Sequence, residues 1–149
     1  MNRYFQIEFS GGGKFQAELL ETEAPKTSEM FWSALPFEGK IVHGSFTGFT
    51  LFSFVDFKVG KVENPFILGA QPGYLFLNTY ANEGLFDGKQ LHEEIIIPYL
   101  NGGIFWNWGG LLPSNLFAKI NENIEQLYPI GRRIQEHGAE IIRYSKLLS

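Results

Sequence analysis

Residues 18–31 constrain the fold of this chain more than any other part of the sequence. They read Glu-Leu-Leu-Glu-Thr-Glu-Ala-Pro-Lys-Thr-Ser-Glu-Met-Phe, so an alternating segment passes through a short acidic turn into a helical segment. Pro25 suits the first position of a helix, because its missing N–H would have no partner there. Pro36 is expected to end this helix, since proline cannot continue one. The stretch therefore predicts a strand, a turn and a helix in direct succession.

Two alternating segments at the start of the chain predict a β-hairpin. Apolar and polar residues alternate over residues 5–9 and again over residues 15–19, which is the period of a strand with one buried face. Ser10 and three glycines lie between them and permit a tight turn.

The remaining pattern predicts one domain over residues 1–149. A second helix is expected within residues 123–137, with Pro129 at its start and Gly138 as its C-terminal cap. Further strands are expected at residues 40–46, 50–59, 74–78, 94–98, 116–120 and 140–144. Loops are expected at residues 64–73, 81–90 and 101–113. A strand-rich chain with two isolated helices predicts a mainly β fold: a closed antiparallel β-barrel of about eight strands, capped by the helices.

Charge and cysteine content exclude several classes of function. The formal net charge is -4 and no basic stripe is present, so nucleic acid is not an expected partner. There are no cysteines, which excludes disulfides and thiolate nucleophiles. The chain starts without a signal-peptide core and has no apolar run long enough to span a bilayer. We therefore expect a soluble cytoplasmic protein with no membrane partner.

Residues 18–31 also resemble the signature of the cyclophilin family. In that family a strand ending Glu-Leu-Phe leads through a turn into Val-Pro-Lys-Thr-Ala-Glu-Asn-Phe. The positions that match in register are Glu18, Leu19, Pro25, Lys26, Thr27, Glu29 and Phe31. Residues 42–49, 72–78 and 116–120 are similar to three further family stretches and occur in the same order. The resemblance covers nearly the whole chain and implies a cyclophilin-like barrel.

The sequence departs from the cyclophilin pattern at Gly44. Cyclophilins isomerise X-Pro bonds with an arginine on this strand, which helps the amide to lose its double-bond character. Aligned on His43 and Phe49, the arginine position is Gly44, and no arginine lies between residues 3 and 132. The family's pocket glutamine falls at about Phe52. The resemblance therefore implies a barrel that has lost prolyl-isomerase activity, similar to bacterial cyclophilin-like domains without an assigned function.

We expect the former isomerase groove, made larger and apolar by the glycine, to bind a small molecule. The groove residues are predicted to be Gly44, Phe49, Phe52, Asn78, Ile96, Trp106 and Trp108. Trp106-Asn107-Trp108 lies between two glycine pairs and is predicted to form either a lid or a self-packed loop. The alternatives are a residual peptidyl-prolyl cis-trans isomerase and a non-enzymatic interaction domain that uses this loop as a partner contact or as the subunit contact of a homo-oligomer.

Two titratable residues are candidates for acid–base catalysis. His43 suits a general base near neutral pH, but strand alternation places it on the face opposite Gly44, which favours a structural role. Glu94 stands beside an apolar strand, where burial favours a protonated acid. Composition, however, favours a solvated strand end for residues 92–94 over such a role. With three histidines and no cysteine, neither a metal site nor a cofactor is expected.

Overall fold

The computed structural model of the chain describes residues 2–45, 47–68, 70–79, 92–102, 105–107, 110–111 and 113–148. At the N-terminus, β1 (Tyr4–Phe9) and β2 (Lys14–Leu19) pair in antiparallel register. Residues Phe5, Ile7 and Phe15 point into the core and their polar neighbours do not. This arrangement confirms the predicted hairpin and its buried face.

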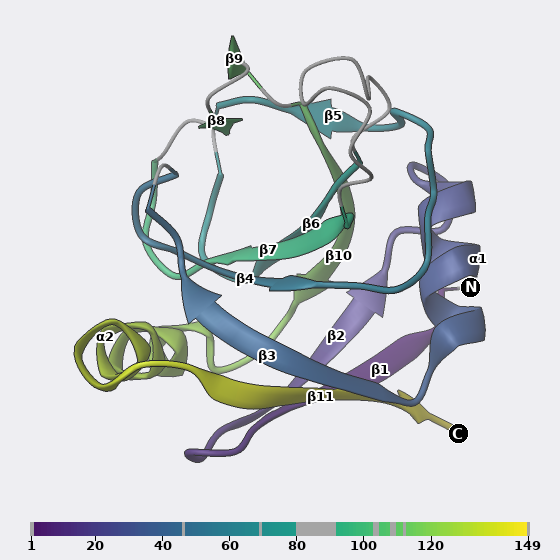
Figure 1. Cartoon of the computed structure of the whole chain (residues 1–149). Helices are drawn as coiled ribbons and strands as arrows, with labels where there is room; N and C mark the ends of the chain where they lie inside the picture. The colour runs from purple at the N-terminus through teal and green to yellow at the C-terminus, as the bar shows by residue number, and fades with distance from the viewer. Residues whose placement is uncertain are drawn as a thin grey trace.

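Eight strands close into a barrel (Figure 1). Around the barrel the order is β2, β1, β11, β3, β4, β7, β6 and β10, and β10 pairs with β2 to close it. The other barrel strands are β3 (Phe37–His43), β4 (Thr50–Phe54), β6 (Tyr74–Asn78), β7 (Glu94–Pro98), β10 (Ser114–Ile120) and β11 (Glu140–Leu147). All of these pairings are antiparallel, which confirms the predicted fold class.

Three short strands were not predicted. β5 (Pro65–Phe66) pairs with the end of β10, and β8 (Trp106–Asn107) pairs with β9 (Gly110–Leu111) in a separate two-stranded sheet. The segment that contains β5 and the segment that contains β8 and β9 were both expected to be loops. Strands of two residues carry too little alternation to be read from sequence. The predicted loop at residues 81–90 lies outside the described residues.

α1 (Pro25–Ala34) closes one end of the barrel core. Its Phe31 is fully buried, with ring centroids 4.6 Å from Phe5 and 5.2 Å from Phe117. The helix begins at Pro25 as predicted, but it has no side-chain N-cap of its own. Instead the carboxylate of Glu63, from a distant loop, accepts a 2.5 Å hydrogen bond from the Thr27 N–H. A carboxylate at this end also complements the helix dipole.

α2 (Leu127–His137) packs against a different part of the barrel and follows a short 3₁₀ helix, η2 (Ile124–Gln126). The two helices lie on well-separated sides of the barrel (Figure 1). α2 begins at Leu127, so the predicted start at Pro129 was wrong. Pro129 is tolerated at the third position because the first N–H groups of a helix have no intrahelical partner. Gly138 is the C-cap residue, as predicted. Within the described ranges, no helix is long and apolar enough to cross a membrane.

The predicted strand at residues 50–59 was too long, because β4 ends at Phe54. Beyond it, Glu93 accepts hydrogen bonds from the backbone N–H groups of Val59 (2.6 Å) and Gly60 (3.1 Å). The chain is thereby held as a loop against a buried carboxylate. β3 also begins earlier than predicted, at Phe37, and ends at His43.

An ion pair ties α2 to β11 and to the first hairpin. Arg133 donates two hydrogen bonds to Glu140, from Nε at 2.5 Å and from a terminal nitrogen at 2.8 Å. Glu140 also accepts the Gly11 N–H at 3.0 Å. The hydrogen bond from Arg133 holds the pKa of the Glu140 carboxyl below its ordinary value, despite partial burial that acts in the opposite direction.

This lowered pKa predicts an acid-sensitive contribution to stability. Because the folded-state pKa is below the unfolded value of about 4.3, the contribution is complete above that pH and is lost as pH falls through the folded value. We expect Glu140→Gln to lower the free energy of unfolding by about 1 kcal/mol at pH 7 and to flatten its decline in acid. Urea unfolding between pH 7 and pH 3 measures this.

Glu29→Gln is the matched control for this measurement. Arg3 also lowers the pKa of Glu29, chiefly through a hydrogen bond, but Glu29 is exposed, so salt and water screen the pair. An equal effect of the two substitutions in 150 mM salt would contradict the role given to Glu140.

Candidate site on the outer face of the barrel

The outward-facing side chains of four neighbouring strands form an apolar row. Phe52 on β4 lies opposite Ile96 on β7, and Ile96 lies opposite Phe76 on β6. Phe76 in turn lies opposite Leu116 on β10. These residues belong to a second apolar cluster, separate from the barrel interior. The row therefore includes two of the predicted groove residues, Phe52 and Ile96.

The middle of this row is covered by the chain itself. The ring of Phe105 lies 4.7 Å from that of Phe76, and the ring of Phe66 lies 5.8 Å away on another segment. The Phe105 N–H donates to the Ile67 carbonyl at 3.1 Å, which holds the two covering segments together. Phe76, Ile96 and Phe105 are consequently buried, and the accessible part of the face lies toward Phe52.

Asn78 and Glu94 form a polar pair in the next row of the same face. They lie opposite each other on β6 and β7, and the Asn78 amide nitrogen donates to Glu94 Oε1 at 3.3 Å. Asn78 is 1% exposed, and its Oδ1 atom receives no hydrogen bond from the residues that the structure describes. If the Asn78 amide were flipped, its Oδ1 atom would face the Glu94 carboxylate. The repulsion between these oxygens excludes the flipped orientation. A buried acceptor without a donor costs free energy unless a ligand or water supplies one.

Aromatic side chains line the exposed side of this pair. The Phe54 ring lies 5.7 Å from that of Phe52 and 6.0 Å from that of His92, measured between centroids. Phe54 pairs with Glu94 in the β4–β7 register and is 56% exposed. Phe54 was not among the predicted site residues, although its alternation with Phe52 in the sequence was a signal that could have identified it.

His43 is held by two hydrogen bonds away from this face. Its Nδ1 lies 2.8 Å from the Gly44 carbonyl and its Nε2 lies 2.8 Å from the Tyr99 hydroxyl. A carbonyl only accepts, so Nδ1 carries a proton, and in the neutral ring Nε2 accepts the Tyr99 O–H. Tyr99 belongs to the main core cluster. As a base His43 would first have to release Tyr99, so its catalytic role stays a prediction.

Gly44 does not open a space in the groove. A Cβ atom at this position would lie 2.5 Å from Thr50 Oγ1 and 3.0 Å from Thr47 Oγ1. These two hydroxyls also hydrogen-bond each other. The expectation that an arginine-to-glycine change enlarges the groove was therefore wrong at this point. Phe49 packs against Tyr99 at 5.8 Å and is 47% exposed, so its place in the groove stays a prediction.

Residues 92–94 do not form a uniformly solvated strand end. His92 is exposed and Glu94 is partly buried, but Glu93 is only 2% exposed and accepts a third hydrogen bond from the Thr79 hydroxyl at 2.6 Å. The solvated alternative was thus wrong for Glu93, whose carboxylate is used to hold the loop after β4. In the structure Glu94, and not Glu93, lies on the outer face, opposite Phe54 and Asn78.

The predicted tryptophan lid falls largely outside the described residues. Trp108 is not among them, and Trp106 is described only as backbone of β8. The roles predicted for the Trp106-Asn107-Trp108 loop, as a lid, a self-packed loop or a subunit contact, stay predictions. Among the described side chains no group of three histidines or acids could hold a metal ion.

The closed antiparallel barrel with its two helices gives this chain a cyclophilin-like fold. More particularly, it belongs to the family described as Protein of unknown function (DUF3830), whose model matches residues 8–146. A search of curated proteins gave no match.

Solved structures show the same fold at low sequence identity. The chain is similar to McbB in complex with tryptophan, with a TM-score of 0.72 and 16% identity over 97% of this chain. It spans only 45% of McbB. A hypothetical protein from Archaeoglobus fulgidus gives a TM-score of 0.65 and 16% identity, covering 98% of this chain and 95% of that one. A cyclophilin-type peptidyl-prolyl cis-trans isomerase from Cryptosporidium parvum gives 0.58 and 18%, covering 100% and 99%.

Proposed function

We propose that the protein binds a small molecule that carries an N–H-bearing cationic group next to an aromatic ring. The cationic group would bind between Asn78 and Glu94, and the ring would lie against Phe52 and Phe54. The buried Asn78 Oδ1 atom without a donor is the observation that carries the proposal. Binding is the function proposed; no catalytic step is required of Glu94.

The ligand class follows from the polar atoms of the site. Asn78 Oδ1 and the carboxylate of Glu94 are both acceptors, so they favour a group that supplies several N–H donors. An ammonium or amidinium group does so, and hydrogen bonds between charged groups are about twice as strong as neutral ones. The half-exposed ring of Phe54 suits offset stacking with an aromatic ligand.

The choice of probe is helped by one structural neighbour. McbB, which has a barrel of this fold, was solved in complex with tryptophan. Tryptophan combines an ammonium group, an indole ring and a carboxylate. For the acidic site proposed here, tryptamine keeps the first two and lacks the carboxylate, whereas indole-3-propionic acid keeps only the ring and the carboxylate.

Isothermal titration calorimetry with these three indoles tests the proposal. We expect tryptamine to bind about tenfold more tightly than indole-3-propionic acid, with tryptophan in between, because a charged hydrogen bond contributes about 1.5–3 kcal/mol. Glu94→Gln should remove most of this preference while keeping the shape of the side chain. Equal affinities for the three probes, or no binding by any, would refute the proposed site.

Asn78→Leu separates ligand binding from folding. It removes an unsatisfied acceptor together with one long hydrogen bond, from the Asn78 amide to Glu94 at 3.3 Å, so the free energy of unfolding should stay within about 1 kcal/mol of the parent while tryptamine affinity falls about tenfold. Glu18→Gln is the matched control for Glu94→Gln, because Glu18 also accepts from amide side chains, Asn2 at 3.1 Å and Asn121 at 3.4 Å, but lies on another strand. It should change neither property.

A further inference from the structure

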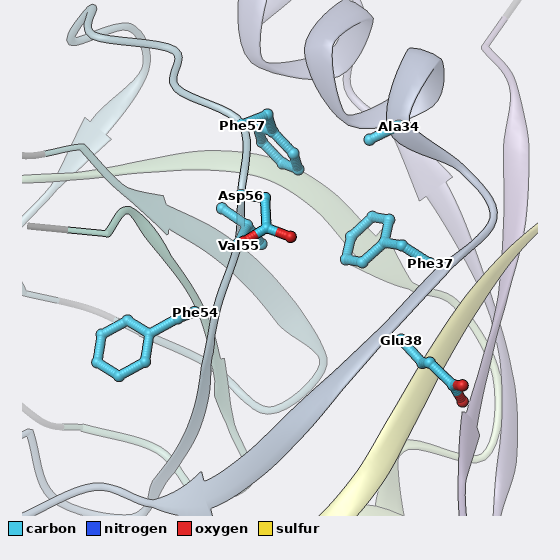
Figure 2. Close-up of a pocket in the computed structure, with 7 residues that line it drawn as sticks. All are labelled: Ala34, Phe37, Glu38, Phe54, Val55, Asp56 and Phe57. Atoms are coloured by element: carbon cyan, nitrogen blue, oxygen red, sulfur yellow. The ribbon is translucent and has the colours of Figure 1, made fainter.

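A cavity lies where β3 and β4 separate. The two strands pair only at Val42–Phe52 and His43–Leu51, so the chain after β4 diverges from the start of β3. The space between them, beneath the end of α1, has a volume of about 340 Å³ (Figure 2). This volume falls at the lower end of the range of small-molecule pockets.

Two aromatic rings form the wall of this cavity. Phe37 and Phe57 lie on facing segments, with ring centroids 6.0 Å apart and ring planes at 77°. Both are partly exposed to the cavity. Phe37 is fixed from behind by Phe31 at 5.6 Å and by Tyr144 at 5.0 Å. Because these partners are buried in the core, the ring of Phe37 is pre-positioned before any ligand binds.

Among the described residues, the ionisable side chains that line the cavity are all acidic. They are Asp56 and Glu38, and both are exposed. Figure 2 shows the carboxylate of Asp56 beside the rings of Phe37 and Phe57, whereas that of Glu38 points away from them. The remaining lining residues include Ala34 and Val55, which add no charge. Aromatic faces and a carboxylate at one cavity complement a cation with an apolar surface.

We propose that this cavity binds the methylated ammonium group of a small organic cation. Such a group has no N–H donors, so it gains little from hydrogen bonding and is recognised by aromatic faces and by nearby negative charge. The rings of Phe37 and Phe57 supply the faces and Asp56 supplies the charge. A primary ammonium group would lose more hydration on entering and is disfavoured relative to the methylated one.

This inference does not depend on the function proposed above. The outer-face site uses acceptors on β6 and β7, whereas the cavity uses rings and a carboxylate beside β3 and after β4. Phe54 lines the cavity and also borders the outer-face site, so it is not used to test either one. Glu94→Gln should leave binding in the cavity unchanged.

Choline and its uncharged carbon isostere, 3,3-dimethylbutan-1-ol, are the probes. The two molecules have the same shape and differ in the positive charge. In titrations of the full chain followed by NMR, we expect choline to bind about three- to tenfold more tightly than the alcohol. Equal affinities, or no saturable binding of choline, would overturn the proposal.

Two substitutions test whether choline binds in this cavity. Phe57→Leu keeps an apolar wall but removes the aromatic face, and Asp56→Asn removes the charge at an exposed position where folding is not at risk. Each should weaken choline binding about threefold or more and leave the alcohol unaffected. Tyr128→Leu and Glu23→Gln, at exposed positions elsewhere, are the controls and should have no effect. If they weaken binding as much, choline is attracted only by the net negative charge and the proposal fails.

Discussion

Replacing Glu93 with alanine is expected to lower the free energy of unfolding by about 3–5 kcal/mol, a large fraction of the stability of an ordinary domain. The carboxylate accepts three hydrogen bonds: 2.6 Å from Val59 N–H, 3.1 Å from Gly60 N–H and 2.6 Å from Thr79 Oγ1. Alanine leaves these donors without an acceptor, and those of Val59 and Thr79 lie in buried residues. Hydrogen bonds to a charged acceptor are also the stronger kind.

Chemical unfolding of three variants separates charge from shape at this position. Glu93→Gln keeps the shape but offers one acceptor oxygen for three donors, so it should recover only part of the loss. Glu23→Ala removes an exposed carboxylate and should change stability by less than about 0.5 kcal/mol. A loss below 1 kcal/mol for Glu93→Ala would show that the loop after β4 does not depend on this carboxylate.

Replacing Gly131 with alanine is expected to lower the free energy of unfolding by about 2–3 kcal/mol. On an ordinary helix the same change stabilises by about 1 kcal/mol. Here the added Cβ atom would lie 2.5 Å from the Cγ and Cε1 atoms of Tyr99. The Tyr99 ring is buried and its hydroxyl is hydrogen-bonded to His43, so the ring cannot move aside without breaking this hydrogen bond.

A double-mutant cycle with Tyr99→Ala tests this cause. In the Tyr99→Ala background the clash is absent, so Gly131→Ala should cost less than about 0.5 kcal/mol or become stabilising. Gln135→Ala, at an exposed position of the same helix, controls for helix propensity alone. A cost for Gly131→Ala that is the same in both backgrounds would exclude Tyr99 as its origin.

The two proposed sites lie on either side of Phe54. On one side are the aromatic row and the Asn78–Glu94 pair, and on the other is the cavity between β3 and β4. The buried side chains of the main core cluster fill the interior of the barrel, so both proposed sites lie outside it. The departure from the cyclophilin pattern at Gly44 leaves the barrel intact because of where this residue lies. The residue faces away from the packed interior and against Thr50.

The sequence by itself determined the hairpin, the helix that starts at Pro25 and the closed antiparallel barrel. These features rest on local patterns: period-two alternation fixes which side chains face the core, and proline fixes where a helix begins. The resemblance to cyclophilins, and not a local pattern, implied Phe52, Asn78 and Ile96 as groove residues, and the structure brings them together with Glu94 on one face.

Only the tertiary structure decided which polar groups are used and which spaces are open. Glu93 and Glu94 look equivalent in the sequence, but it is Glu93 that accepts hydrogen bonds from the loop after β4, which lies more than 30 residues earlier. Glu63 caps a helix that lies 36 residues before it, and Tyr99 requires a glycine in α2. Such contacts depend on distances between segments far apart in the chain, and no local pattern encodes those distances. For the same reason the cavity at Phe37 and Phe57 became visible only once the two strands were seen to separate.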